Sequence, residues 1–189
     1  MFRLLLFLSL FPIALALAAR WWFGLRVLIS IGKQSCRCNL ERWFPSPDDQ
    51  SIIHRAENTA EEFGRELRAK ALAEWAEHDS KAAASREATR RFGMAVPPLT
   101  GIIVVFAVIV GKVPVIGAFA ILLTATALSA ILGLLTLPPE LGAISRTARR
   151  VREDRAFPVG DDGESVARCA FAHAWEQALP PVLRWVHKS

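Results

Sequence analysis

The sequence lacks most of the short motifs that mark a catalytic or cofactor site. It has no glycine-rich phosphate loop, because the glycines between residues 101 and 142 are spread through apolar segments. No serine lies in G-x-S-x-G, and no cysteine follows an activating motif. None of the four histidines lies in H-E-x-x-H, which places two imidazoles and a glutamate base on one helical face. These absences argue against the common classes of hydrolase and nucleotide-binding enzyme.

Cysteine is scarce as well, with three residues in a chain of 189. Cys36 and Cys38 are separated by one residue, so a disulfide between them would be strained. Their C-x-C could be half of a metal site, but no second cysteine pair completes it. We therefore predict juxtamembrane thiols at these positions, and a packed thiol at Cys169.

Hydrophobic residues are abundant, at 52% of the chain, and they gather in three segments. Residues 4–19 resemble a signal peptide, with Ala-x-Ala triplets that suit cleavage. However, the apolar character resumes after Arg20, and Trp21 and Trp22 suit an interfacial anchor. We expect an uncleaved membrane anchor over residues 1–31, with a cleaved signal peptide as the alternative.

The second and third apolar segments predict a transmembrane helical hairpin over residues 94–139. The two spans cover 94–111 and 113–139, each about as long as the roughly 20 residues that cross a bilayer. Ionisable residues are absent from 94–111 and from 113–137, which argues against a transporter or channel. Small residues that allow close helix packing line the third segment: Gly117, Ala118, Ala120, Ala125, Ala127, Ser129 and Ala130.

Positive charge predicts the orientation of these spans. Eighteen arginines and five lysines give a net charge of +5. They lie among acids without interleaved aromatics, so we expect no nucleic-acid binding. Eleven of them fall on one side of three spans, leaving Arg3 and Lys112 opposite: Lys33, Arg37, Arg42, Arg86, Arg90, Arg91, Arg146, Arg149, Arg150, Arg152 and Arg155. The positive-inside rule predicts an inner or plasma membrane protein with its N-terminus outside and its polar segments in the cytoplasm.

The polar segments predict further helices. Residues 32–50 resemble a loop, and a helix is expected from Ser51 to about Arg91 within the polar segment 32–93. An apolar stripe marks this helix at helical spacing: Ala60, Phe63, Leu67, Ala71 and Trp75. In 140–189 we expect a basic helix, a turn at 157–163 and an amphipathic helix from Glu164 to Gln177. The predicted fold class is therefore an all-α integral membrane protein without a β-rich region.

Two glutamate–histidine pairs are the nearest approach to a metal motif. Glu74 and His78 lie at i and i+4, so both could face one ion, although a solvated pair beside Trp75 is the simpler interpretation. His173 and Glu176 precede Gln177, a poor zinc ligand, and the histidine adjoins an apolar face. We predict no catalytic residue and no resident cofactor, with zinc as the alternative.

Residues 135–151, L-T-L-P-P-E-L-G-A-I-S-R-T-A-R-R-V, resemble the segment after the transmembrane hairpin of bacterial integral-membrane neutral zinc metallopeptidases. That family reads approximately T-L-P-V-E-x-x-A-S-x-R-A there, so Glu140 matches the family glutamate. The resemblance covers about residues 74–178, with one extra residue between Ala143 and Ser145. It implies that Glu140 is a third zinc ligand and that His78 matches the second histidine of the family H-E-x-x-H.

The first histidine and the base glutamate of that motif have no counterparts in register, so the resemblance implies a shortened, inactive relative. We therefore expect a non-catalytic membrane protein that acts by binding a protein partner or by forming a homo-oligomer. The alternative is an active membrane metallopeptidase with an unusual Glu74, His78 and Glu140 metal site, an oxygen-rich set that favours a harder metal than zinc.

Overall fold

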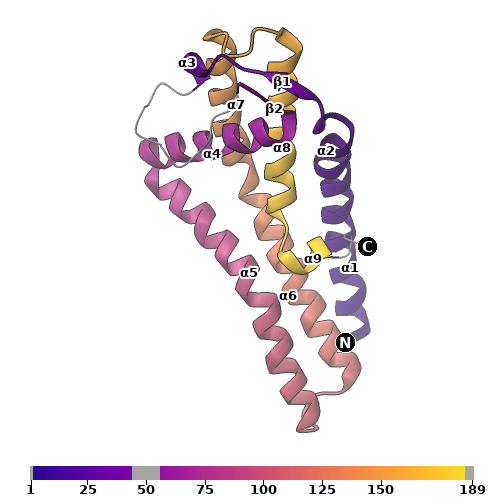
Figure 1. Cartoon of the computed structure of the whole chain (residues 1–189). Helices are drawn as coiled ribbons and strands as arrows, with labels where there is room; N and C mark the ends of the chain where they lie inside the picture. The colour runs from indigo at the N-terminus through magenta and orange to yellow at the C-terminus, as the bar shows by residue number, and fades with distance from the viewer. Residues whose placement is uncertain (1, 44–55, 186–189) are drawn as a thin grey trace.

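The computed structural model describes residues 2–43 and 56–185, and helices dominate it (Figure 1). The elements, in chain order, are α1 (Phe2–Ala19), the π-helix η1 (Arg20–Leu25), α2 (Arg26–Ile31), β1 (Ser35–Arg37), α3 (Leu40–Trp43), β2 (Glu57–Thr59), α4 (Ala60–His78), α5 (Ser80–Ile109), α6 (Val115–Leu135), α7 (Leu137–Glu153), α8 (Gly160–Ala178) and α9 (Pro181–Trp185). Helices α4, α7 and α8 with the two short strands form a head at one end of the long hairpin of α5 and α6. The predicted all-α membrane fold is confirmed.

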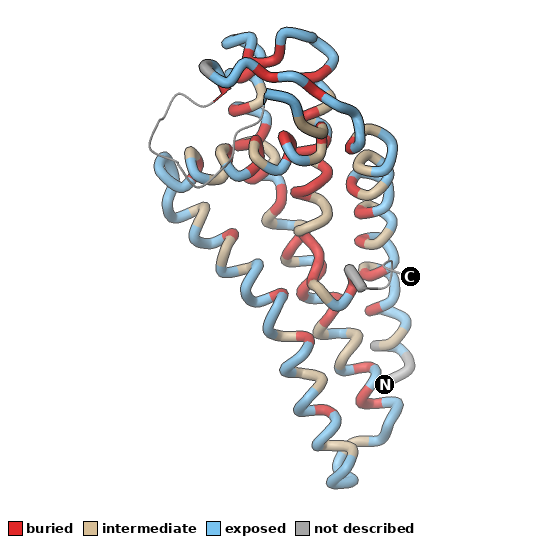
Figure 2. Tube along the Cα trace, viewed as in Figure 1, coloured by how far each residue is buried: buried red, intermediate tan, exposed pale blue. Residues whose placement is uncertain are grey.

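Three continuous helical stretches are long and apolar enough to cross a bilayer. They are Leu6–Ile31, Ser80–Ile109 and Val115–Glu153. Large apolar side chains remain exposed along them, as in Phe106 at 65% and Ile109 at 74% (Figure 2). Such exposure is costly in water but normal against lipid tails. The three spans are therefore consistent with contact with a lipid bilayer.

The hairpin between the second and third spans is tight, as predicted. Helix α5 ends at Ile109, and Gly111 adopts φ +73°, a left-handed conformation that favours glycine. Pro114 then caps the start of α6. Helix α6 lies between α1 and α5, and all the predicted small residues except Ala125 are buried there. The small residues of α6 are thus used for close packing of three apolar helices of the same chain.

The polar helix expected to run to about Arg91 is broken near its middle. Helix α4 ends at His78, and α5 starts at Ser80 and continues without interruption to Ile109. The Asp79 carboxylate accepts a 3.0 Å hydrogen bond from the amide of Ala82, which caps the new helix. The predicted start at Ser51 lies outside the described residues. The prediction of one continuous helix was wrong here because no proline or glycine marks the break in the sequence.

Helix α7 continues the third span into the head. Pro138 and Pro139 occupy its first turn, where proline is tolerated because the missing N–H would have no helical partner. Thr136 stands at the N-cap position but makes no side-chain cap. Its hydroxyl instead lies 2.9 Å from the carbonyl of Leu132, to which it donates. Thr136 is thus engaged with α6 and not with the helix it precedes.

Two short segments depart from the predicted loop at residues 32–50. Strands β1 and β2 form an antiparallel pair in which Cys36 lies opposite Asn58, and a single helical turn, α3, follows β1. Residues 57–59 are therefore strand and not helix as predicted. The predicted turn at 157–163 is also shorter, because α8 begins at Gly160.

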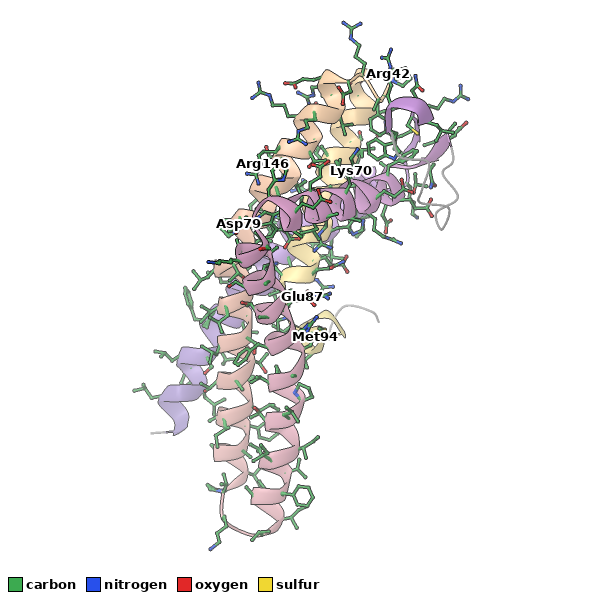
Figure 3. All side chains as sticks on the ribbon, turned by 90° about the vertical axis from the view of Figure 1, so that its left-hand side faces the viewer. Arg42, Lys70, Asp79, Glu87, Met94 and Arg146 are labelled. Atoms are coloured by element: carbon green, nitrogen blue, oxygen red, sulfur yellow. The ribbon has the colours of Figure 1, made fainter. Side chains whose placement is uncertain are left out.

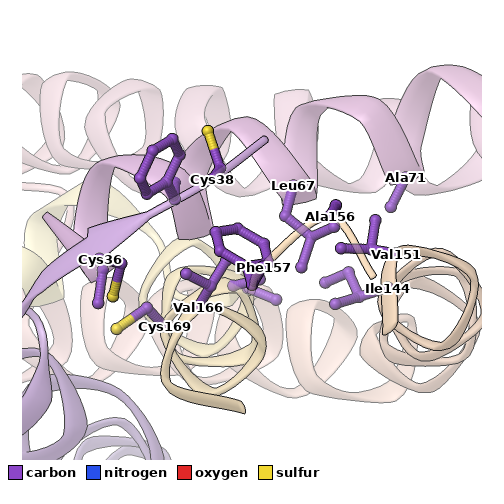
Figure 4. Packing of buried hydrophobic residues seen from close by; sticks show 14 of the residues in the cluster. Cys36, Cys38, Leu67, Ala71, Ile144, Val151, Ala156, Phe157, Val166 and Cys169 are labelled. Carbon is purple, nitrogen blue, oxygen red and sulfur yellow. The ribbon is translucent and has the colours of Figure 1, made fainter. Parts of the chain in front are cut away.

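The head has its own apolar core between α4, α7 and α8 (Figure 4). All five residues of the predicted stripe on α4 are buried, which confirms that prediction, and all but Trp75 belong to this core. Trp43, Phe63 and Phe157 contact one another edge to face, with ring centroids 4.9–5.8 Å apart. Aromatic contacts of this kind add roughly 0.5–1.5 kcal/mol per pair beyond area burial. The head is therefore a packed helical unit that fixes the direction of α4 relative to α7.

A buried ion-pair site beneath the head

Glu140 is the centre of a buried cluster of charged side chains. Its carboxyl is 1% exposed, although it belongs to a charged residue type that is rarely buried unpaired. Arg68 donates from Nε to Oε1 at 2.8 Å, and its Nη2 donates to the same oxygen. Arg86 donates from Nε to Oε2 at 2.8 Å. Both carboxylate oxygens are therefore hydrogen-bonded to guanidinium groups.

Each of these three side chains comes from a different helix. Arg68 lies on α4, Arg86 on the polar first part of α5, and Glu140 in the first turn of α7. Arg86 also donates from Nη1 to the carbonyl of Gly133 at 2.9 Å and to the hydroxyl of Thr136 at 2.7 Å. The cluster thus joins the head to the point where α6 passes into α7.

A close backbone contact supports the same junction. A Cβ at Gly133 would lie 2.0 Å from the carbonyl oxygen of Ala178, so no other residue fits without movement. This approach brings the end of α8 next to the α6–α7 junction that Arg86 binds. Glycine at position 133 is therefore a packing requirement of the site.

The cluster contains more positive than negative charge. Two guanidinium groups face one carboxylate, and the arginine side chains are only 10% and 9% exposed. Burying charge costs several kcal/mol per ion, which only close pairing and further hydrogen bonds offset. The second positive charge is partly compensated by the carbonyl and hydroxyl that Arg86 binds. The cluster keeps one excess positive charge.

An open cavity of about 300 Å³ adjoins the cluster in the angle between α4 and α5. Arg68, Arg86 and Glu140 line it together with Arg90 and Glu87, and apolar walls come from α4 and the start of α5. Glu87 binds Arg90 from one side, with an Nε–Oε2 distance of 2.7 Å. Three guanidinium groups and two carboxylates therefore line one cavity, and Figure 3 labels Glu87 among the side chains of α5.

The structure places the predicted Glu74 and His78 away from this cluster. Glu74 accepts a 2.9 Å hydrogen bond from the hydroxyl of Thr147, and Arg150 lies 3.4 Å away. His78 is exposed and lines a small hollow with Glu74 and Arg150, which does not include Glu140. The polar partners of Glu74 thus lie on α7, whereas those of Glu140 lie on α4 and α5. Residues 2–43 and 56–185 contain no group of three or more histidine, cysteine or acidic residues that could hold a metal ion.

Arg68 and Arg86 are not among the site residues predicted from the sequence. A signal for Arg68 exists, because it lies four residues after Gly64 and seven before Trp75, on the edge of the buried stripe of α4. An arginine at such a position requires a buried carboxylate or carbonyl partner. Arg86 has no comparable signal, since its face of α5 becomes buried only when the hairpin packs beneath the head.

The other predicted candidates are buried in the head. His173 lies 3.2 Å from the carbonyl of Glu61 through Nε2, and burial lowers the pKa of its imidazole. Burial is also the main cause that raises the pKa of Cys36 to about 12 and those of Cys38 and Cys169 to about 11. All three thiols are buried and outside any disulfide, so they are poor nucleophiles at neutral pH.

Comparison of the chain with models of protein families, with curated proteins and with solved structures gives no match.

Proposed function

We propose that the chain is a non-catalytic integral membrane protein that acts by binding a protein partner or a second copy of itself. Its scaffold resembles that of membrane zinc metallopeptidases, with the position of a metal ligand taken over by an ion-pair cluster. The head is held at the cytoplasmic face of an inner or plasma membrane, with the N-terminus outside.

One observation carries this proposal, namely the occupation of both Glu140 oxygens by Arg68 and Arg86. A carboxylate that binds a metal ion must offer an oxygen lone pair at about 2.0–2.2 Å from the ion. Two guanidinium groups within hydrogen-bond distance of Glu140 repel a divalent cation and compete for those lone pairs. A zinc hydrolase also needs an open coordination position and a base, which this cluster does not supply.

The exposed surface of the head is the part of the chain that we expect to bind the partner or the second copy. Four arginines on α7 are exposed: Arg146, Arg149, Arg150 and Arg152. Glu153 pairs with Arg149 only at the surface, where such pairs contribute little to stability. This basic face suits contact with an acidic surface of a partner or of another copy.

Metal content and peptidase activity of the purified full chain test the non-catalytic part. We expect no stoichiometric metal in samples purified without chelator and no cleavage of casein beyond that of a mock preparation. His78→Ala serves as the matched variant, since this residue is exposed and outside the cluster. Stoichiometric zinc together with casein cleavage that His78→Ala abolishes would overturn the proposal.

The binding part is tested by mass measurement in detergent and by cross-linking in the membrane. We expect a dimer or a discrete complex with another protein, and its loss when Arg146, Arg149 and Arg152 are replaced by glutamine. A chain that is monomeric and uncross-linked at native expression would contradict it.

A further inference from the structure

We propose that the cavity between α4 and α5 binds the phosphate group of a phosphate ester, and that an anionic phospholipid of the surrounding membrane supplies it. The inference rests on the proposed function in one respect, that Glu140 holds arginines and not a metal ion. It adds a ligand class to the cavity beneath the head.

The cavity has an excess of positive donors. Arg68, Arg86 and Arg90 line it against Glu87 and Glu140, which leaves one uncompensated positive charge. Nη1 of Arg68 and Nη2 of Arg86 donate no hydrogen bond to any residue that the structure describes. Guanidinium groups bind phosphate oxygens strongly because their N–H groups match the spacing of those oxygens. A phosphate would therefore balance the charge and accept from the remaining donors.

The end of the cavity at Arg90 also lies at the depth of lipid headgroups. Arg90 and Arg86 precede Met94, where the apolar span begins, by four and eight residues of one straight helix. At about 1.5 Å per residue these positions lie roughly 6 and 12 Å from the start of the hydrocarbon. The headgroup layer on each side of a bilayer is about 5–8 Å thick. Arg90 is thus within reach of lipid phosphates, whereas Arg86 lies about 6 Å farther from the hydrocarbon.

The tryptophans of η1 support this depth from the other side of the molecule. Trp21 and Trp22 are 45% and 58% exposed, as expected of an interfacial aromatic belt. They adjoin Gly24, whose Cβ would lie 3.4 Å from the carbonyl of Ala172 and 3.6 Å from the amide of Glu176 on α8. Gln177, the next residue of α8, lines the cavity. The exposed tryptophans and the cavity therefore lie at about the same depth relative to the membrane.

The size of the cavity fits a headgroup. Small-molecule sites have volumes of roughly 300–1,000 Å³, and this one lies at the lower limit. That volume admits a glycerol phosphate but not the acyl chains, which would extend along the exposed apolar face of α5. Met94 and Val105 lie on the same side of α5 as Arg90, at i+4 and i+15, and are 39% and 57% exposed. Head and tail of one lipid thus have adjoining surfaces.

The test uses the full chain in detergent, titrated with phosphatidylglycerol or phosphatidylcholine and followed by native mass spectrometry. The variant is Arg90→Gln, and its matched control is Arg91→Gln. Both arginines bind Glu87 from the same helix, but only Arg90 lines the cavity. We expect saturable binding of phosphatidylglycerol, weakened about tenfold by Arg90→Gln, the loss expected for one charge-assisted hydrogen bond. Arg91→Gln should change the affinity less than about twofold, because the Arg91 side chain is mostly exposed and pairs with Glu87 at the surface.

Two further arms fix the source of the phosphate. Soluble glycerol phosphate and inorganic phosphate are added as competitors at millimolar concentration. Binding of glycerol phosphate that depends on Arg90, without preference for phosphatidylglycerol, would retain the phosphate site and overturn the lipid assignment. Equal effects of the two arginine variants, or no saturable binding of any anion, would overturn the site itself. Because the readout is lipid binding, such a failure with metal-free, inactive protein leaves the proposed function standing.

Discussion

Nε of Arg86 donates a 2.8 Å hydrogen bond to Oε2 of Glu140, although 54 residues separate them along the chain. The bond connects the start of the second span with the first turn after the third, so it forms only when the hairpin is closed. Arg68 then completes the cluster from the head. Head and hairpin are thereby joined by charge in addition to apolar packing, and the first prediction concerns this junction.

Replacing Glu140 with glutamine should destabilise the protein strongly. The change leaves two buried guanidinium groups without a counter-charge, and losing one partner of a buried pair costs about 3–5 kcal/mol of unfolding free energy. Unfolding in detergent micelles measures the effect. Glu164→Gln removes an exposed pair with Arg168 and should cost less than about 1 kcal/mol.

A triple variant separates ion pairing from packing in the same cluster. Arg68→Met, Glu140→Leu and Arg86→Met together remove all three charges, and apolar replacement of buried ionic triads is often neutral or stabilising. We expect this variant to recover most of the stability that Glu140→Gln loses. A triple variant less stable than Glu140→Gln would show that the cluster is required for its shape and not for its charge balance.

Gly64→Ala should destabilise the head although alanine favours helix. A Cβ at Gly64 would lie 2.6 Å from Cβ of Cys169 and 2.9 Å from the amide of Ala170, so α4 and α8 must separate. The expected loss is about 1–3 kcal/mol, the usual cost of overpacking. Gly93→Ala on α5 is the control, because nothing lies within 4 Å of its added Cβ. That variant should gain roughly 0.5–1 kcal/mol by the same unfolding measurement.

The stability of the head should fall as the pH falls below about 6.5. Burial lowers the pKa of His173 in the folded state, so the unfolded chain binds the proton more readily. The contribution of His173 is therefore fully present above the unfolded pKa of about 6.5, and it is lost as the pH falls toward the lower folded value. The slope is at most about 1.4 kcal/mol per pH unit for one group.

Thermal unfolding between pH 7.5 and 5.5 checks this dependence. The groups that face His173 are Glu61 and Arg65 on α4 and Glu176 on α8. His173→Gln should flatten the slope, whereas His78→Gln should leave it unchanged because that imidazole is exposed. Equal slopes in the native chain and in His173→Gln would contradict the prediction.

Impermeant maleimide should label Lys112→Cys from outside the cell and Ser80→Cys only after permeabilisation. Positive charge on the polar segments predicts this orientation. The native thiols provide a silent background, because they are buried and their pKa values are raised to about 11–12. The reverse labelling pattern would instead support cleavage of the first apolar segment as a signal peptide.

The apolar and helical periodicities determined much of the fold by themselves. The spans, the tight tip at Gly111 and the buried stripe on α4 follow from local composition, because lipid or a helical core is the only way to satisfy such surfaces. The helix break at Asp79 and the pairing of β1 with β2 could not be predicted in this way. Both involve short polar segments that have no apolar periodicity. Glycine lowers helix propensity at any position, so the sequence gives no sign that Gly64 is required; that requirement comes from the close approach of α8.

Within the site, Glu140 also has one feature that the sequence determined and one that only the tertiary structure decided. Its sequence context determined that it starts a helix beside a membrane span, as the helix dipole and the preceding prolines favour. Only the tertiary structure decided that Arg68 and Arg86 are its partners, because three helices distant in sequence must meet before their charges interact. Coulomb attraction depends on distance in space and not on separation along the chain, so the packed fold determines which residues pair with a buried carboxylate.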